Sequence, residues 1–549
     1  MKPSSLDTKM DKERLISSGQ DMTVADYNLK KLKPRVFAPY IVPEDTPVLN
    51  YEQGEAYTMS SEMELYTAVL TASISDKFYE SAATRSGRIA ELVAACDPVF
   101  VANLAVYARE VMNLRRVPLV LIVELSRIHH GDDLVSRTIS HCVRRPDEIT
   151  ALMDIYQQRN DHGFSQHIYR RLSSQIKKGL KEAFNRFDEY QFAKYKNAGE
   201  GLSLRDALFL VHPSPDTTEQ QAVFDRIASD TLAVPYTWET ELSALGQRGL
   251  SESEFAEAKK SLWEELIVSG KVGYMALLRN LRNILLAGVD EEHLDIVCDR
   301  LSSEHEVLTS KQLPFRFLSA YLTLKEGFVD SQDEDILRRL TKVECSLEKA
   351  AQIACSNVKG FEEDMSVLLA CDTSGSMFNK VGHKGSVAMY DIGILLSMML
   401  KKHCCNVTSG MFADTWKVFD TGSQPILKAT TEFRNHIGEV GYSTNGYTVI
   451  DWALQNDRQF DRIMMFTDCQ LWDSVFRENS LKKSWNLYKE KYPDAKLFLF
   501  DLAGYGTSPL KLQGNDVCAI SGWSEKVFDV MTAFEQGDSV LSVIKGIEV

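Results

Sequence analysis

A buried strand that runs into an oxygen-rich loop and then into an amphipathic helix constrains this chain more than any other feature. The apolar strand covers 367–371, and the loop reads Asp372-Thr-Ser374-Gly-Ser376. A helix with apolar residues at helical spacing is predicted over 389–400. This order of elements builds a ligand site at the carboxyl edge of the sheet in α/β domains. The sequence therefore predicts such a site at this loop.

The loop offers oxygen atoms as ligands. Asp372, Ser374 and Ser376 alternate with small residues, so that three oxygen donors are able to converge on one point. Hard oxygen donors without sulfur or imidazole suit Mg²⁺, Mn²⁺ or Ca²⁺. The alternative is a turn and helix cap, because Asp and Ser favour both.

The D-x-S-x-S pattern resembles the metal-ion-dependent adhesion site of von Willebrand factor A domains. The resemblance implies that Thr444, with Thr448 as the alternative, supplies the threonine of the second loop. It also implies that Asp468, at the end of a predicted strand over 463–467, completes the site. In that family the hydroxyls bind the metal directly, the aspartates bind it directly or through water, and one open position accepts a partner's carboxylate. The expected cofactor is a divalent cation, Mg²⁺ first, with Mn²⁺ or Ca²⁺ as alternatives.

Strands and helices alternate throughout the C-terminal part of the chain, which predicts a doubly wound, Rossmann-like parallel sheet over residues 361–549. The remaining predicted elements are strands over 408–412, 417–419 and 496–501 and helices over 447–455, 484–490 and 523–537.

The preceding region is helical in pattern. Residues 57–360 show apolar side chains at helical spacing and no series of alternating strands. Many short helices without a strong heptad indicate a HEAT-like repeat over 51–360, with an ordinary helical bundle as the alternative. Residues 1–50 are polar, and we expect an extended or partly disordered arm. The predicted fold class is multidomain α + α/β.

Composition sets the expected environment. Ten cysteines occur without a Cys-x-x-Cys pair, which favours a reducing, cytoplasmic location over a disulfide scaffold. No apolar run approaches the ~20 residues of a membrane span. The net charge of −15 argues against non-specific nucleic-acid binding, but it leaves room for a local basic face.

Such a face is predicted in the helical region. The segment 165–215 has more basic than acidic residues, and Arg170, Lys177 and Lys181 fall on one side of a helical wheel. A second basic window, 109–145, includes Arg144. Cations on helices neutralise backbone phosphates of nucleic acids, although a charged face is more often only solvated.

Several segments of the helical region form a recognisable series. They are Ala193-Lys194-Tyr195-Lys196, Leu202-Ser203-Leu204-Arg205-Asp206-Ala207-Leu208, Val211-His212-Pro213, Tyr236-Thr237-Trp238-Glu239 and Met275-Ala276-Leu277-Leu278-Arg279-Asn280-Leu281-Arg282-Asn283. Together these segments resemble the TROVE domain of Ro ribonucleoproteins. The resemblance implies a HEAT-repeat ring closed by the A domain, with small structured non-coding RNAs (Y RNAs) on its outer surface and 3′ ends of misfolded RNAs in its central hole.

The resemblance assigns RNA contacts to individual residues. Lys194 and His212 match contacting residues of the family, and Lys196 and Arg205 lie in the same signature. Lysine and arginine would hold phosphates, while histidine would stack on a base or donate to a phosphate. The alternative for His212 is a helix-end residue satisfied by backbone. This chain departs from the signature in its 197–201 loop and at Leu202, Leu204 and Phe209, which leaves fewer cations at this edge.

The leading hypothesis is therefore a non-catalytic, monomeric RNA-binding protein of Ro type that acts in RNA quality control. The second is a metal-dependent scaffold that docks a protein partner's carboxylate through the A domain. An enzyme is not expected, because the sequence contains no nucleophile and base arrangement and no phosphate-binding glycine loop.

Overall fold

The computed structural model describes residues 43–72, 77–160, 172–196, 201–356, 365–381, 385–472, 480–512 and 516–549, together with the backbone of Met22–Thr23. The chain divides into two compact units. The first contains residues up to Cys96, Leu313–Ser319 and Cys355–Val543, and the second contains Asp97–Gln312, Ala320–Ala354 and Ile544–Val549. These units do not follow the predicted boundaries at residues 50 and 360, because the first helices of the predicted helical region pack with the A domain.

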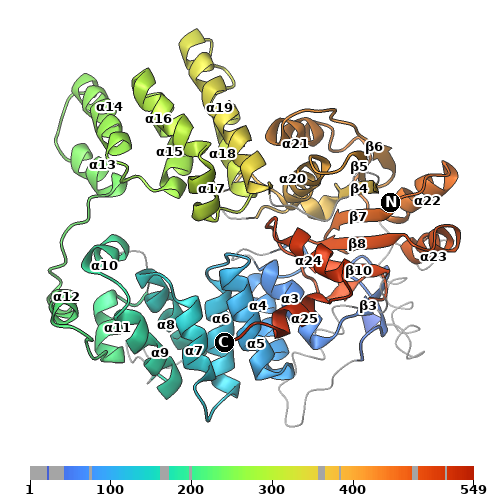
Figure 1. The fold of residues 1–549 in the computed structure, drawn as a ribbon, viewed down its shortest axis with the longest axis horizontal. Coiled ribbons are helices and arrows are strands. Elements are labelled where there is room, and N and C mark those ends of the chain that lie inside the picture. Colours follow the sequence, from blue (N-terminus) through green and yellow to red (C-terminus); the bar gives the residue numbers. More distant parts are fainter. Residues whose placement is uncertain are drawn as a thin grey trace, which may run out of the picture. The chain divides into compact units, whose positions relative to one another are not determined.

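The first unit is built on a six-stranded sheet in the order β10-β8-β7-β4-β5-β6 (Figure 1). All neighbouring strands are parallel except β6, which pairs antiparallel with β5. The sheet confirms the predicted α/β fold, although β10 and one helix, α21, were not predicted. The strands are β4 (Ser366–Asp372), β5 (Asn406–Phe412), β6 (Trp416–Val418), β7 (Arg462–Thr467), β8 (Lys496–Asp501) and β10 (Val517–Ser521).

Helices cover the apolar sheet. One side packs against α22 and α23, and its core includes Leu368, Ile463 and Leu497 from three adjacent strands. The helix α20 packs on β4 and β7, where Gly393 of α20 approaches the Phe466 side chain. The helices are α20 (Met389–Lys401), α21 (Ile426–Asn435), α22 (Tyr447–Gln455), α23 (Leu481–Lys491) and α24 (Val527–Glu535), with a 3-10 turn at Gly375–Phe378.

A second small sheet and two helices complete this unit. Its strand order is β1-β2-β3-β9, so that the hairpin of β2 and β3 pairs with a strand that follows β8. The expected arm over residues 1–50 is wrong for residues 43–50, because Val48 and Leu49 are buried apolar positions in β2. The elements are β1 (Met22–Thr23), β2 (Pro47–Leu49), β3 (Glu55–Thr58), β9 (Thr507–Ser508), α3 (Ser61–Leu70) and α4 (Ala82–Ala95).

The second unit is helical. Helices pack as successive neighbours, α5 on α6, α7 on α9, α13 on α14 and α15 on α16 (Figure 1), as expected for a HEAT-like repeat. Closure into a ring stays a prediction. The helices are α5 (Pro98–Glu110), α6 (Val117–Ile128), α7 (Leu134–Cys142), α8 (Pro146–Asn160), α9 (Ser174–Phe184), α10 (Glu189–Tyr195), α11 (Leu204–Val211), α12 (Thr218–Ser229), α13 (Trp238–Gly246), α14 (Glu252–Val268), α15 (Tyr274–Ala287), α16 (Glu291–Leu301), α17 (Glu304–Ser310) and α19 (Glu334–Ala354); α18 (Phe315–Phe328) and α25 (Val540–Lys545) are divided between the units.

Among the described helices, none combines the length and the apolar character that crossing a membrane requires. All ten cysteines have free thiols.

Candidate functional site

The oxygen-rich loop lies at the carboxyl end of β4, which β5 and β7 flank in the sheet; strands β5 and β6 extend it on one side, and the later strands β7, β8 and β10 on the other. Ligand sites of doubly wound sheets form at such a switch point. The Asp372 carboxylate accepts a hydrogen bond from Ser374 N at 2.9 Å and another from the Thr467 hydroxyl at 2.6 Å. The hydroxyls of Ser374 and Ser376 lie 3.4 Å apart. The three predicted donors of the first loop are therefore gathered at one place.

Asp468 follows β7, next to β4 in the sheet. One of its carboxylate oxygens accepts from Gln470 N at 3.0 Å, while the other is buried and has no hydrogen-bond partner within the described residues. Burial raises the pKa of Asp468 to about 7, with a further contribution from the negative charge of Asp372. Burial also raises the pKa of Asp372 to about 6. Two buried carboxylates thus lie close enough for their charges to interact.

The second loop is fastened to the first. Gly375 N donates to Tyr442 O at 2.8 Å, and Trp472 N donates to Thr444 O at 2.8 Å. These backbone bonds place Thr444 between the first and third loops, where it is 4% exposed. The hydroxyl of the alternative residue, Thr448, instead donates to Asn445 O at 2.7 Å in the first turn of α22. The geometry favours Thr444 as the ligand.

Asp414, just after β5, organises the same loop, and sequence reasoning did not find it. Its carboxylate accepts from Ser443 N at 2.7 Å and from Tyr442 N at 3.3 Å. A Cβ atom at Gly441, where φ is +87°, would lie 2.1 Å from this carboxylate, so that the loop needs glycine there.

Three tyrosines lie over the site, and we name Tyr51, Tyr79 and Tyr505 the aromatic cover. Tyr51 stacks on Tyr79 with 5.2 Å between ring centroids, and Tyr505 packs edge-on against both. The Tyr79 hydroxyl donates to the Glu52 carboxylate and lies within hydrogen-bonding reach of Ser376. Tyr51 N donates to the Gln470 side chain at 3.0 Å, two residues after Asp468. The segment before α4 therefore reaches the predicted metal ligands.

The residues present fit a divalent cation. They comprise two buried carboxylates, one with an unpartnered oxygen, and hydroxyl groups at the same edge of the sheet. Such oxygen sets suit Mg²⁺, which prefers carboxylates together with hydroxyl or water ligands. Asp372, Ser374, Ser376, Thr444 and Asp468 would hold the ion, which would offer an electrophilic position to a further carboxylate.

A second acidic group, in the helical unit, is already neutralised. Glu264, Asp290 and His293 bring possible ligand atoms close together. The Lys260 ammonium, however, lies 2.6 Å from Asp290 and 3.8 Å from Glu264. The Lys260 ammonium thus already offsets the negative charge of this group.

Three of the predicted RNA-contacting lysines keep their charge available. Lys177 and Lys181 lie on α9, whose opposite side buries Ile176 and Leu180 as predicted. Lys194 is exposed on α10, with its ammonium 5.9 Å from the centroid of the Tyr190 ring. Within the described ranges, none of the three lysines has an acidic partner.

Other predicted contacts are differently placed. Lys196 pairs with Asp230 at 2.5 Å, and Arg144 pairs with Glu110. Their charges are thus partly offset, in contrast to the expectation of free cations. Arg205 is exposed, with its guanidinium 5.7 Å from the Phe209 ring. His212 ends α11 in the left-handed region, with φ of 50°, and is exposed. Arg170 lies outside the described residues.

The chain matches two family models. The TROVE domain model matches residues 229–352, and the Ro60 vWA domain model matches residues 366–535. This chain belongs to the Ro family. The first match begins after Lys194 and His212, so that the roles of these two residues stay predictions.

Relatives of this Ro-family chain are distant. "Telomerase protein component 1" of Mus musculus is 23% identical, over 50% of this chain and 14% of that protein. "RNA-binding protein RO60" of Caenorhabditis elegans is 22% identical, over 51% of this chain and 42% of that protein. The chain thus spans less than half the length of these relatives.

The fold has a counterpart among solved structures. The Ro (Rsr) protein of Deinococcus radiodurans superposes with a TM-score of 0.56 and 18% sequence identity. The superposition covers 87% of this chain and 100% of the Deinococcus chain. The arrangement of a helical region followed by an A domain is therefore that of the Ro fold.

Proposed function

We propose that this Ro-family chain is a non-catalytic RNA-binding protein. The observation that carries the proposal is the set of cations Lys177, Lys181 and Lys194, which have no acidic partner within the described residues of an otherwise acidic protein of net charge −15. Lys196, close to Lys194 in the chain, is by contrast paired with Asp230. Unpaired lysines on helices are suited to phosphates, and the Caenorhabditis elegans relative carries RNA binding in its name.

The proposed ligands are small structured non-coding RNAs and single-stranded 3′ ends of misfolded RNAs, in the context of RNA quality control. Phosphate contacts spread over several helices would give affinity with little sequence preference. The departures at Leu202, Leu204 and Phe209 reduce the polar groups at one edge, so that we expect weaker binding there than the family signature implies.

The charge of the lysines is the first quantity to test. Replacing Lys177 and Lys194 together by alanine should weaken binding of a stem-loop with a 3′ single-stranded tail by about tenfold. It should also reduce the slope of log K against log salt by about 1.4 if both phosphate contacts fall on single strands. Fluorescence anisotropy over a salt series measures both.

The matched control removes two lysines that are already paired. Lys260 pairs with Asp290 at 2.6 Å and Lys325 with Glu344 at 2.9 Å, and both residues belong to the helical unit. The Lys260→Ala/Lys325→Ala variant should keep the affinity and the salt slope. An equal loss of affinity in both double variants would show that only the net charge of the protein matters. Wild type that fails to bind the RNA at low salt would overturn the proposal.

A second candidate function is metal-dependent docking of a protein, favoured by the unpartnered buried oxygen of Asp468. A bound cation would offer its open position to a partner's carboxylate. The aromatic cover is close to the predicted ligands, and the Tyr79 hydroxyl donates to the Glu52 carboxylate.

Proteins recovered with the chain in Mg²⁺ should be lost in the Asp372→Ala variant if this second function holds. The control is Asp420→Ala, which removes an exposed carboxylate of the same unit that pairs with Lys401 at 2.5 Å. Quantitative mass spectrometry of the recovered proteins compares the three samples, and identical sets for wild type and Asp372→Ala exclude metal-dependent docking.

A further inference from the structure

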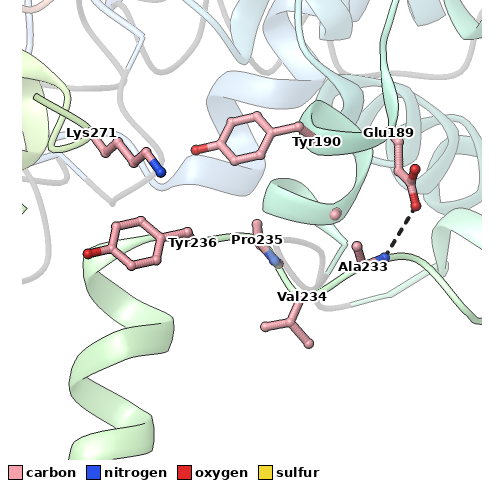
Figure 2. A pocket seen from close by; sticks show the side chains of 8 residues that line it. Glu189, Tyr190, Ala233, Val234, Pro235, Tyr236 and Lys271 are labelled. Atoms are coloured by element: carbon pink, nitrogen blue, oxygen red, sulfur yellow. Dashed lines mark hydrogen bonds between the residues drawn. The ribbon is translucent and has the colours of Figure 1, made fainter. Parts of the chain in front are cut away.

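A cavity of about 450 Å³ lies in the helical unit next to α10 (Figure 2). Its walls come from α10, from the extended segment before α13 and from the segment before α15. The volume falls in the range of about 300–1,000 Å³ that is typical of small-ligand sites. We name it the Tyr190–Tyr236 cavity, lined by Glu189, Tyr190, Ala193, Ala233, Val234, Pro235, Tyr236 and Lys271.

The cavity combines aromatic rings with an ammonium group. Tyr190 is 45% exposed, which is high for a large aromatic side chain. Lys271 extends between the two tyrosines in Figure 2, and its ammonium lies 4.5 Å from the centroid of the Tyr236 ring. Lys194 does not line the cavity, but its ammonium lies 5.9 Å from the ring of Tyr190, which does. Aromatic faces next to cations are how proteins hold unpaired nucleotides.

The ring of Tyr236 is held in place before any ligand binds. Its hydroxyl donates to Glu265 at 2.7 Å. The next residue, Thr237, caps α13 by accepting from Thr240 N at 3.3 Å. The residue after that, Trp238, stacks on the buried Trp263 with 6.2 Å between centroids. A ring fixed in this way loses little conformational entropy when a ligand packs against it.

The remaining wall is apolar and solvent-exposed. Val234 is 83% exposed, so that its apolar side chain is available for contact with a ligand. Pro235 restricts the backbone beside it. Glu189 accepts from Ala233 N at 3.4 Å, which fastens the segment to α10. The segment that carries this apolar surface is therefore held against α10.

Two lysines near the cavity walls have no acidic partner within the part of the chain that the structure describes, Lys194 and Lys271. Glu189 pairs with Arg226 of α12, so that its charge is offset. Glu265 accepts from the uncharged Tyr236 hydroxyl, which does not offset its charge. A phosphate group would therefore be attracted to the lysine side of the cavity, away from Glu265.

We propose that the Tyr190–Tyr236 cavity binds one unpaired nucleotide of an RNA strand. The base packs against the rings of Tyr190 and Tyr236, and its phosphate lies at the ammonium groups of Lys271 and Lys194. The proposal rests on the proposed RNA-binding function and names the part of the RNA that this cavity takes. Neither Lys271 nor Tyr190 belongs to the residues that the sequence singled out.

The test compares two labelled RNAs by fluorescence anisotropy, a blunt stem-loop and the same stem-loop with a short 3′ single-stranded tail. The Tyr190→Ala/Tyr236→Ala variant should bind the tailed RNA about tenfold or more weakly than wild type and bind the blunt RNA equally well. Tyr190→Phe/Tyr236→Phe keeps both rings and should stay within about threefold of wild type on the tailed RNA, because stacking needs the ring and not the hydroxyl. When the tail consists of abasic nucleotides, wild type and the alanine variant should bind the RNA with the same affinity.

A second measurement guards against a misfolded variant. A 4-thiouridine in the tail of the RNA should crosslink wild type at Tyr190, Tyr236 or a cavity neighbour, located by mass spectrometry. Wild type that binds the tailed RNA with crosslinks elsewhere, or an alanine variant with unchanged affinity, overturns the cavity but leaves RNA binding standing. An abasic tail bound as tightly as the normal tail by both proteins also overturns it. Wild type that binds neither RNA at low salt overturns the proposed function itself.

Discussion

Mg²⁺ should raise the free energy of unfolding of the A-domain unit by about 2.7 kcal/mol at a concentration one hundred times its dissociation constant, since it binds only the folded site. The Asp468→Asn variant should lose this effect. Without metal, the same variant should be more stable than wild type by about 2 kcal/mol at pH 7.5, because it removes one of two adjacent buried negative charges. The asparagine oxygen retains the bond from Gln470 N. Urea unfolding in EDTA and in Mg²⁺ measures each value.

The pH dependence of the metal-free protein follows from the same two carboxylates. The folded pKa values of about 6 for Asp372 and about 7 for Asp468 are above those of an unfolded chain, near 3.9. Between about pH 4 and pH 7 the folded state therefore binds more protons than the unfolded state, and stability falls as pH rises through this window. In EDTA we expect a decline from pH 5 to pH 8 in wild type and a shallower one in Asp468→Asn.

An exposed carboxylate of the same unit provides the control. Asp420→Ala removes an exposed carboxylate of the same unit and should leave both the Mg²⁺ effect and the pH dependence in place. If Asp468→Asn is less stable than wild type in EDTA and wild type is insensitive to Mg²⁺, the carboxylates serve the fold and no cation site exists at this edge.

The position of the Asp372 loop was predictable because its elements are local. An apolar run over 367–371 that is followed by small polar residues predicts a buried strand, and the residue after such a strand lies at the carboxyl end of the sheet. The same reasoning applies to 463–467 and Asp468. Parallel pairing then brings the two strand ends together, and the register pairs Cys371 with Phe466. Local periodicity therefore determined which aspartates face each other.

The aromatic cover was not predictable in this way. Tyr79 and Tyr505 are more than four hundred residues apart in the chain, and neither lies in a motif. Their contact depends on the hairpin of β2 and β3 pairing with β9, which carries a weak strand signal of two residues. Lys196 and Arg144 show the same limit, because sequence reasoning counts charges on one helix and cannot see an acid on the next.

Replacing Arg88 by methionine should destabilise the A-domain unit by about 3–5 kcal/mol. Arg88 is buried in α4 and donates to Gly504 O at 2.7 Å, to Glu80 at 2.8 Å and to Glu64 at 3.2 Å. Methionine keeps the apolar length of the side chain but removes a charge that Glu80 and Glu64 share, although Arg85 still lies 3.1 Å from Glu80. Removal of one partner of a buried ion pair has this large effect because the other charge is left uncompensated.

Calorimetric or urea unfolding of the full chain measures the loss, and a second substitution separates charge from packing. Adding Glu64→Gln to Arg88→Met should recover at least about 1 kcal/mol, because it removes a buried carboxylate that has lost its ion pair with Arg88. The control is Lys482→Met, which breaks an exposed pair with Glu55 in the same unit and should change stability by less than about 1 kcal/mol. Equal losses for Arg88→Met and Lys482→Met would contradict the structural role of the buried cluster.

The loss of Arg88 should also affect the predicted metal site. Glu80 follows Tyr79 directly, so that the cluster which fastens α4 to the loop after β8 also positions the aromatic cover. Arg88→Met should therefore loosen Tyr79 and Tyr51 over Ser376 before the sheet itself unfolds. In Arg88→Met, hydrogen exchange at the backbone amides of residues 50–52 and 79–80 should quicken ahead of exchange in β4 and β7. Simultaneous exchange in both regions would show that the cover and the sheet unfold as one.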